Sequence, residues 1–83
     1  MENKSIELGF WGGMEMNYQK LEEITKGKTL PLNAENEDKE RVIIEKFHNG
    51  DVKYYRLSTF QSNDWVRINR YYEDGSIDTT YEK

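Results

Sequence analysis

The chain has 83 residues, a formal net charge of −4 and no cysteine. This length predicts one small domain, residues 1–83, with too little interior for a large enclosed active site. The lack of cysteine excludes disulfides, thiolate zinc sites and cysteine nucleophiles, and the negative charge disfavours a general polyanion binder. Because there is neither a signal-peptide pattern nor an apolar run near the roughly 20 residues that cross a bilayer, we expect a cytoplasmic protein.

The first part of the chain predicts a short strand followed by one helix. Apolar residues alternate with other residues from Ser5 to Trp11, which is the period of a strand with one buried face. From Met14 to Thr25 they recur every three or four positions with glutamates facing away, which predicts an amphipathic helix of about three turns. Gly27 suits the left-handed position that follows a helix end.

Residues 28–40 are predicted to form a loop. Pro31 interrupts regular structure, and the segment from Asn33 to Glu40 is polar without an apolar period. The loop adds to a charge asymmetry, since residues 1–40 hold nine acidic and five basic side chains while residues 41–83 hold seven of each. The net negative charge is therefore confined to the first half of the chain.

The second half predicts four strands joined by tight turns. Asn49-Gly50 and Asp74-Gly75 are the dipeptides that two-residue hairpin turns prefer, and they separate segments rich in Val, Ile, Tyr, Trp and Thr. The polar segment 61–64 is a plausible loop between the two hairpins. The predicted strands lie near Arg41–Phe47, Val52–Phe60, Trp65–Tyr72 and Ser76–Glu82.

These turns imply a register for each pair of strands. A two-residue turn at Asn49-Gly50 sets Ile44 opposite Tyr55, and a four-residue loop sets Leu57 opposite Ile68. A two-residue turn at Asp74-Gly75 sets Tyr72 opposite Ile77. All three registers place the same residues on one apolar face of the sheet, in which Arg70 is the single charged member. The predicted helix is expected to pack on this face. That predicted core face collects Val42, Ile44, Tyr55, Leu57, Thr59, Val66, Ile68, Tyr72, Ile77, Thr79 and Tyr81.

The fold class that follows is α+β, with an N-terminal strand and one amphipathic helix packed on a four-stranded antiparallel β-meander. A small, partly closed β-barrel with one helix is the alternative, and it would bury part of the second face of the sheet. That second face carries more aromatic residues than a solvated sheet face usually does. Aromatic residues interleaved with arginine are typical of the central residues of protein interfaces, and the candidate partner-binding set is Tyr54, Arg56, Trp65, Arg67 and Tyr71.

The function that this surface favours is a small non-enzymatic binding or regulatory protein that contacts a protein partner or a second copy of itself. The alternative explanation is structural, with cross-strand pairs or a curled sheet accounting for the same side chains. Two other functions remain open: binding of single-stranded nucleic acid by stacking on the sheet face, and inhibition by an acidic surface that mimics nucleic acid. The acidic set for the last comprises Glu15, Glu22, Glu23, Glu35, Glu37 and Asp38.

No residue pattern predicts catalysis, a metal or a cofactor. His48 is the only histidine and lies beside a predicted turn, whereas a zinc site or a catalytic base would need further ligands or an oriented partner. The acidic loop lacks the ligand spacing and central glycine of a calcium-binding loop. We therefore expect no enzyme activity, no bound metal and no cofactor.

Overall fold

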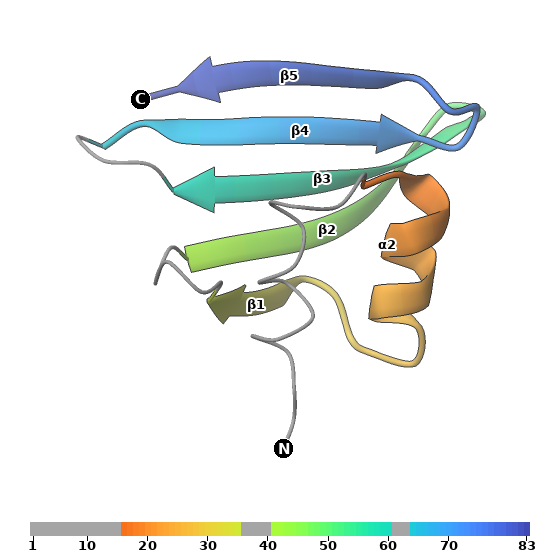
Figure 1. Ribbon diagram of the computed structural model, residues 1–83. Helices are drawn as coiled ribbons and strands as arrows, with labels where there is room; N and C mark the ends of the chain where they lie inside the picture. The colour runs from red at the N-terminus through yellow and green to blue at the C-terminus, as the bar shows by residue number, and fades with distance from the viewer. Residues whose placement is uncertain (1–15, 36–40, 61–63) are drawn as a thin grey trace.

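One helix and five strands make up the described part of the chain, which in this computed structural model comprises residues 16–35, 41–60 and 64–83 (Figure 1). The predicted strand Ser5–Trp11 and the predicted helix start at Met14 lie outside these residues. The elements are α2 (Tyr18–Thr25), β1 (Leu32–Glu35), β2 (Arg41–Asn49), β3 (Val52–Phe60), β4 (Val66–Tyr72) and β5 (Ile77–Glu82). Within the described ranges, no helix has the length and apolar character that a membrane span requires.

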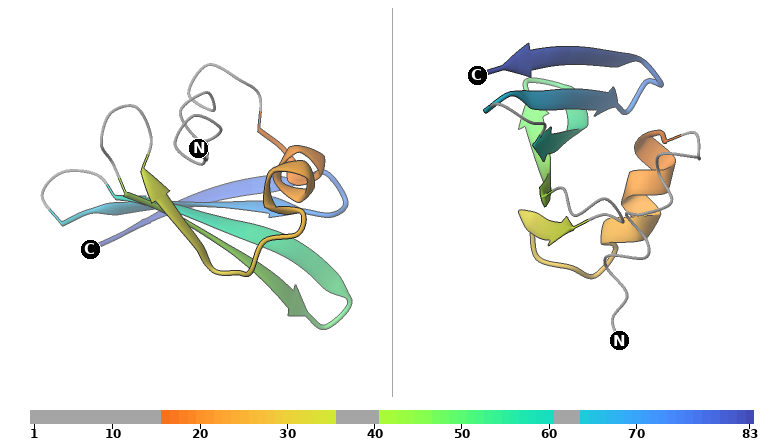
Figure 2. Two further views of the ribbon diagram at one scale, coloured as in Figure 1. Left: turned by 90° about the horizontal axis from the view of Figure 1, so that it is seen from below. Right: turned by 60° about the vertical axis from the view of Figure 1, so that its left-hand side comes forward.

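The strands form an antiparallel meander in the order β1-β2-β3-β4-β5, which confirms the predicted α+β class. Each strand pairs with the next one along the chain, so β1 and β5 are the two edges of the open sheet that the described residues form. The partly closed barrel is therefore not the fold of the described strands. Figure 2 shows the strong twist of the sheet and α2 on one side of it.

Helix α2 is defined by its two ends. Asn17 caps its start, because the side-chain Oδ1 accepts a hydrogen bond from the Lys20 amide at 2.8 Å. Gly27 follows its end with a φ of 76°, as the sequence predicts. With only eight residues, α2 would be marginal in water by itself, so its stability depends on packing against the sheet.

Strand β1 corrects the prediction of a loop over residues 28–40. Leu32 pairs with Ile44 of β2, and its side chain is buried. The strand has only four residues, and its apolar positions are Leu32 and the small Ala34. So short a segment is too little for a period to be read from the sequence.

The register between β2 and β3 differs from the predicted one by two residues. Ile44 pairs with Leu57, and Asn49 pairs with Val52, so the turn residues are Gly50 and Asp51. Of the two turn residues, only Gly50 has a positive φ, 66°. This fits a type II′ turn, because a type I′ turn requires a positive φ at both central positions. Because the side-chain period is two, a shift of two leaves every residue on its predicted face.

The other two registers differ by one residue each. Phe60 pairs with Val66, so the β3–β4 loop has one residue more than predicted. In the β4–β5 hairpin Tyr71 pairs with Ile77, and Gly75 has a φ of 98°. The Gly75 amide donates to the Tyr72 carbonyl and the Tyr72 amide donates to the Ser76 carbonyl, both at 2.9 Å. This is a three-residue hairpin loop with a bulge at glycine, not a two-residue turn.

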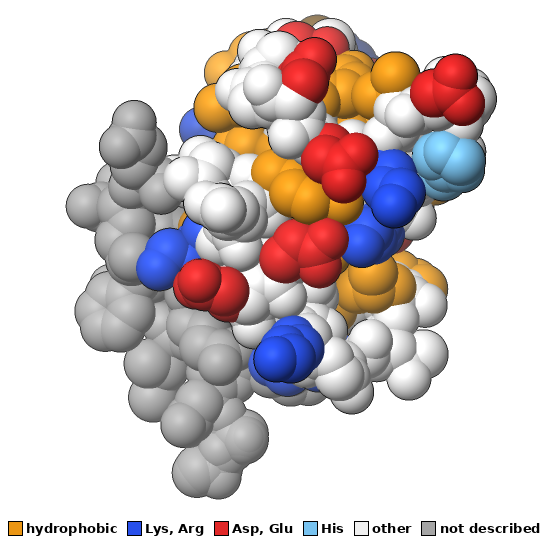
Figure 3. All heavy atoms as spheres, turned by 90° about the vertical axis from the view of Figure 1, so that its right-hand side faces the viewer, with side chains coloured by type: hydrophobic (Ala, Val, Ile, Leu, Met, Phe, Trp, Pro, Cys, Tyr) orange, Lys and Arg blue, Asp and Glu red, His pale blue; other side chains and the backbone are white. Residues whose placement is uncertain are grey.

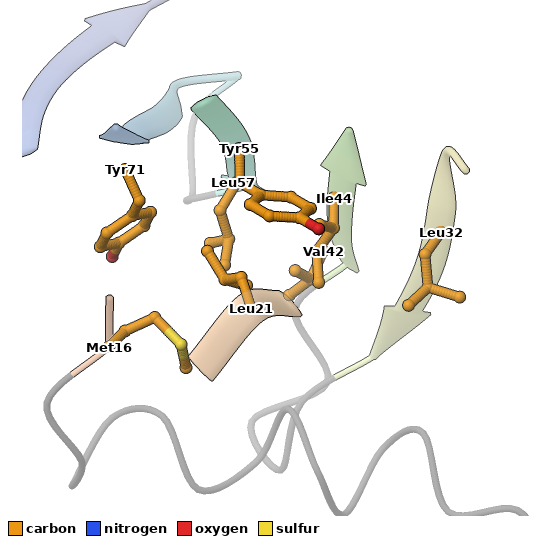
Figure 4. Close-up of a cluster of buried hydrophobic side chains, with 8 residues drawn as sticks. All are labelled: Met16, Leu21, Leu32, Val42, Ile44, Tyr55, Leu57 and Tyr71. Carbon is orange, nitrogen blue, oxygen red and sulfur yellow. The ribbon is translucent and has the colours of Figure 1, made fainter. Parts of the chain in front are cut away.

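The two one-residue differences place the side chains of β4 on the face opposite to the predicted one. They leave the side chains of β5 on their predicted face. The inner face, defined by Val42, Ile44, Tyr55 and Leu57, packs against α2. The outer face is the opposite one, and it carries the even-numbered residues of β4, including Ile68, which the sequence assigns to the core face. Figure 4 shows the buried cluster on the inner face: Met16, Leu21, Leu32, Val42, Ile44, Tyr55, Leu57 and Tyr71.

Candidate functional site

An aromatic row crosses the outer face of the sheet. Phe47, Tyr54 and Tyr72 come from β2, β3 and β4 and stand opposite one another in the register. The Phe47 and Tyr54 ring centroids are 5.3 Å apart with nearly parallel planes, and those of Tyr54 and Tyr72 are 5.1 Å apart. Such ring pairs contribute about 0.5–1.5 kcal/mol beyond their buried area. All three rings are half-buried, so each keeps an accessible edge or face.

A row of charges runs beside the aromatic row. Arg56 of β3 lies directly opposite Arg70 of β4, and each arginine has a carboxylate on its other side. The Arg56 Nη1 is 3.7 Å from an oxygen of Glu45, and the Arg70 Nη1 is 3.7 Å from an oxygen of Asp78. Like charges directly opposite each other destabilise a strand pair, and the flanking carboxylates offset this repulsion. Folding alone does not require two neighbouring arginines at this position.

Hydrogen bonds hold the Arg70 and Tyr72 side chains in this arrangement. The Arg70 Nη1 donates to Thr80 at 3.1 Å, and the Tyr72 hydroxyl donates to Asp78 at 3.2 Å. Asp78 also raises the pKa of Tyr72, although the larger cause is partial burial of the hydroxyl. The Arg56 Nε is buried without a hydrogen-bond partner among the described residues. The two rows are therefore linked, and Asp78 is the residue shared between them.

A third row gives the outer face a buried floor. Ser58 and Ile68 face each other between Ile43 and Thr80, and Ile68 is only 1% exposed. No described helix covers this side of the sheet. The outer face consequently combines a buried floor with half-exposed aromatic and charged side chains.

The five predicted site residues do not share one face, which corrects the prediction. Tyr54 and Arg56 lie on the outer face, whereas Arg67 and Tyr71 pair with inner-face residues of β3 and so point to the inner side. Tyr71 is 8% exposed and belongs to the core. Trp65 precedes β4 and is 40% exposed, with the Lys83 Nζ 5.4 Å from its ring centroid.

The cause of this error is the length of the β3–β4 loop. One extra residue in the β3–β4 loop exchanges the odd and even positions of β4, so Arg70 and Tyr72 stand where the sequence predicts Arg67 and Tyr71. Signals for the longer hairpin loop were present in part. Asp74 Oδ1 accepts from both the amide and the hydroxyl of Ser76, at 2.9 and 2.7 Å, as in an Asx turn, and Gly75 supplies the left-handed position that a three-residue hairpin loop requires.

A polar cluster on the inner side joins α2 to the sheet. The Lys46 Nζ donates to Glu22 at 2.9 Å and lies 5.3 Å from the Tyr55 ring centroid and 5.8 Å from that of Tyr18. The Lys46 hydrogen bond lowers the pKa of Glu22 and likewise raises the pKa of Lys46. Burial raises the pKa of Tyr18. The cluster orients α2 on β2 and β3, and it is fully explained by that structural role.

The hairpin end of the molecule carries charges of both signs (Figure 3). Acidic and basic side chains alternate with apolar patches there, and His48 lies exposed at the rim. Among the residues that the structure describes, no three His, Asp or Glu side chains gather as a metal site would require. This end of the molecule therefore presents no field of one sign to a charged ligand.

Comparisons with protein-family models, with curated proteins and with solved structures find no match to this chain. Function is accordingly inferred from the outer face itself.

Proposed function

We propose that this chain is a small non-enzymatic binding protein that contacts a protein partner through the outer face of its sheet. The observation that carries the proposal is the aromatic row beside two neighbouring arginines, half-exposed on a face that α2 does not cover. Tyrosine and arginine dominate the energetically important centres of protein interfaces. We also propose a cytoplasmic location, because a chain without cysteine gains nothing from an oxidising compartment.

The chemistry of the outer face indicates what kind of protein surface it fits. The aromatic row, Phe47, Tyr54 and Tyr72, suits apolar or aromatic side chains that pack on ring faces. Arg56 and Arg70 keep about a third and a quarter of their side chains exposed, and a carboxylate placed over both would relieve their mutual repulsion. The preferred partner surface is thus an apolar patch with an acidic side chain beside it.

The same arrangement argues against nucleic acid as the ligand. Arg56 and Arg70 each have a carboxylate within 3.7 Å, and these carboxylates weaken the attraction of both arginines for phosphate. We expect a fluorescently labelled single-stranded oligonucleotide to show no binding by anisotropy at low salt. Binding with a steep salt dependence would favour the nucleic-acid function instead.

The acidic-mimic alternative has little support from the residues that can be placed. Glu22 is engaged with Lys46, and Glu23 lies 3.9 Å from Lys20, so each has a basic neighbour. Glu35 is exposed at the end of β1, away from both on the chain. Glu15, Glu37 and Asp38 lie outside the described residues. We therefore prefer the outer face to the acidic set as the binding surface.

The test compares Tyr54→Ala and Arg56→Ala with Lys53→Ala as the matched control. Lys53 is the neighbour of Tyr54 on β3, is exposed and points to the opposite side of the sheet. Each tagged variant is used to capture proteins from cells, after circular dichroism has shown that it is folded. We expect the wild type and Lys53→Ala to retain the same proteins and the two outer-face variants to lose them. Identical captured sets from all four proteins would show that the outer face is not the binding surface.

A further inference from the structure

The two edges of the sheet are unequally protected. Strand β1 has four residues and its Leu32 side chain is buried, whereas all six residues of β5 are exposed. On the inner side of β5, Ile77 is 52% exposed and Tyr81 is 60% exposed. Edge strands are usually blunted by charged side chains, a proline, a bulge or extreme shortness, and of these β5 has only Asp78 and Glu82, both on the outer side. This edge is a template for pairing with another strand.

The hydrogen bonds of the hairpin determine which backbone groups β5 offers. The Ser76 carbonyl accepts from the Tyr72 amide of β4, so the backbone of Ser76 faces β4. Backbone groups alternate in direction along a strand, and those of Ile77, Thr79 and Tyr81 therefore point away from the sheet. The same three residues carry their side chains on the inner side. The residues whose backbone groups are free at the edge are thus the ones that also carry the most apolar side chains of β5.

We propose that β5 pairs antiparallel with β5 of a second copy of this chain, about a two-fold axis at Thr79. In this register Ile77 stands opposite Tyr81 of the second copy, and the reverse pair forms on the other side of the axis. Aromatic residues opposite β-branched residues are favourable cross-strand pairs. The outward groups of the three residues then make about six hydrogen bonds, which leaves none of them unpaired.

The acidic residues of β5 select this register over its neighbours. With the axis at Thr79, Asp78 stands opposite Thr80 and no two acidic side chains are directly opposed. An axis at Thr80 would set Asp78 opposite Glu82 twice, and an axis at Asp78 would set that residue opposite its own copy. Like charges directly opposite each other are destabilising, so only the first register satisfies both the apolar and the charged side chains.

The resulting assembly is closed and keeps the outer faces together. A two-fold axis perpendicular to the sheet uses the β5 edge of both copies, so pairing stops at two. Both outer faces then lie on the same side of one continuous sheet. This inference concerns the edge of the sheet and does not depend on the proposed function, which concerns its face.

The first test measures mass against concentration by sedimentation. We expect the wild type to rise from 9.9 kDa toward twice that value, with an affinity at the weak end for protein interfaces, because one strand pair buries little area. Ile77→Lys and Tyr81→Lys should remain monomeric while folded, since both residues are exposed. Val52→Lys, which also replaces an exposed β-branched residue, should dimerise like the wild type. Tyr54→Ala should do so too, which separates this inference from the proposed function.

The second test measures the register. The chain has no cysteine, so Lys83→Cys can be labelled with a single nitroxide while Asp78 and Glu82 stay in place. Pairing about Thr79 sets the two labelled backbones about 27 Å apart, and pairing about Thr80 would set them about 20 Å apart. A distance near the first value supports the proposal. A monomer at every concentration, lysine variants that dimerise like the wild type, or the shorter distance would each overturn it.

Discussion

The anchoring of α2 by Leu21 yields a prediction about the stability of the whole domain. The Leu21 side chain is completely buried in the cluster with Tyr55 and Leu57, and it comes from a helix of only eight residues. Replacing such a leucine by alanine costs about 2–5 kcal/mol, because the lost transfer energy is joined by the cavity that remains. A chain of this length has a stability of roughly 4–12 kcal/mol, so Leu21→Ala is expected to remove between about a sixth of it and all of it.

Urea denaturation followed by far-ultraviolet circular dichroism provides the assay. Glu23→Ala is the matched control on the same helix, because Glu23 is exposed and alanine is an excellent helix former. We expect Leu21→Ala to lower the urea midpoint at an unchanged slope, while the control changes the unfolding free energy by less than about 0.5 kcal/mol. A loss below about 1 kcal/mol for Leu21→Ala would mean that α2 does not depend on this contact.

Three further predictions concern the outer face, the second hairpin and the link between α2 and the sheet. Ile68→Ala should cost about 2–4 kcal/mol although α2 does not cover Ile68, and a urea midpoint close to that of the wild type would contradict the buried floor. Gly75→Ala should lower stability by about 1 kcal/mol through backbone strain alone, because its φ is 98° and an added Cβ meets no atom within 4 Å; an unchanged melting temperature would refute this. The lowered pKa of Glu22 stabilises the fold above the ordinary glutamate pKa and ceases to do so as pH falls through the lowered value. Between about pH 6 and pH 3 the stability advantage of the wild type over Glu22→Gln should therefore shrink, by a few tenths of a kcal/mol for this half-exposed pair, and a constant difference would exclude the linkage.

The fold class could be predicted from the sequence because its signals are local. Alternation of apolar residues in the four C-terminal strands, the helical period before Thr25 and the glycine at position 27 each depend on near neighbours along the chain. The same signals place Val42, Ile44, Tyr55 and Leu57 in one core. Strand β1 could not be predicted, since it has only four residues and its pairing with β2, in which Leu32 is buried, is a tertiary interaction.

The candidate site could be predicted only in part, because it depends on the parity of β4. Tyr54 and Arg56 are correctly placed on the outer face, since an error of two residues in the first hairpin does not change parity. Arg67 and Tyr71 are exchanged for Arg70 and Tyr72 by a single extra loop residue. Loop length is set by backbone geometry at residues such as Asp64, with a φ of 68°, which the sequence does not reveal.

Site-specific photo-crosslinking at Tyr54 and Lys53 tests the proposed binding surface most directly. These neighbours on β3 point to opposite sides of the sheet, so a photoreactive residue at one or the other samples the outer or the inner side in an otherwise identical protein. We predict an adduct with a partner protein from position 54 that is absent from position 53 and becomes about tenfold weaker in an Arg56→Ala background. Adducts of equal strength from both positions, or an adduct from position 53 alone, would contradict binding through the outer face.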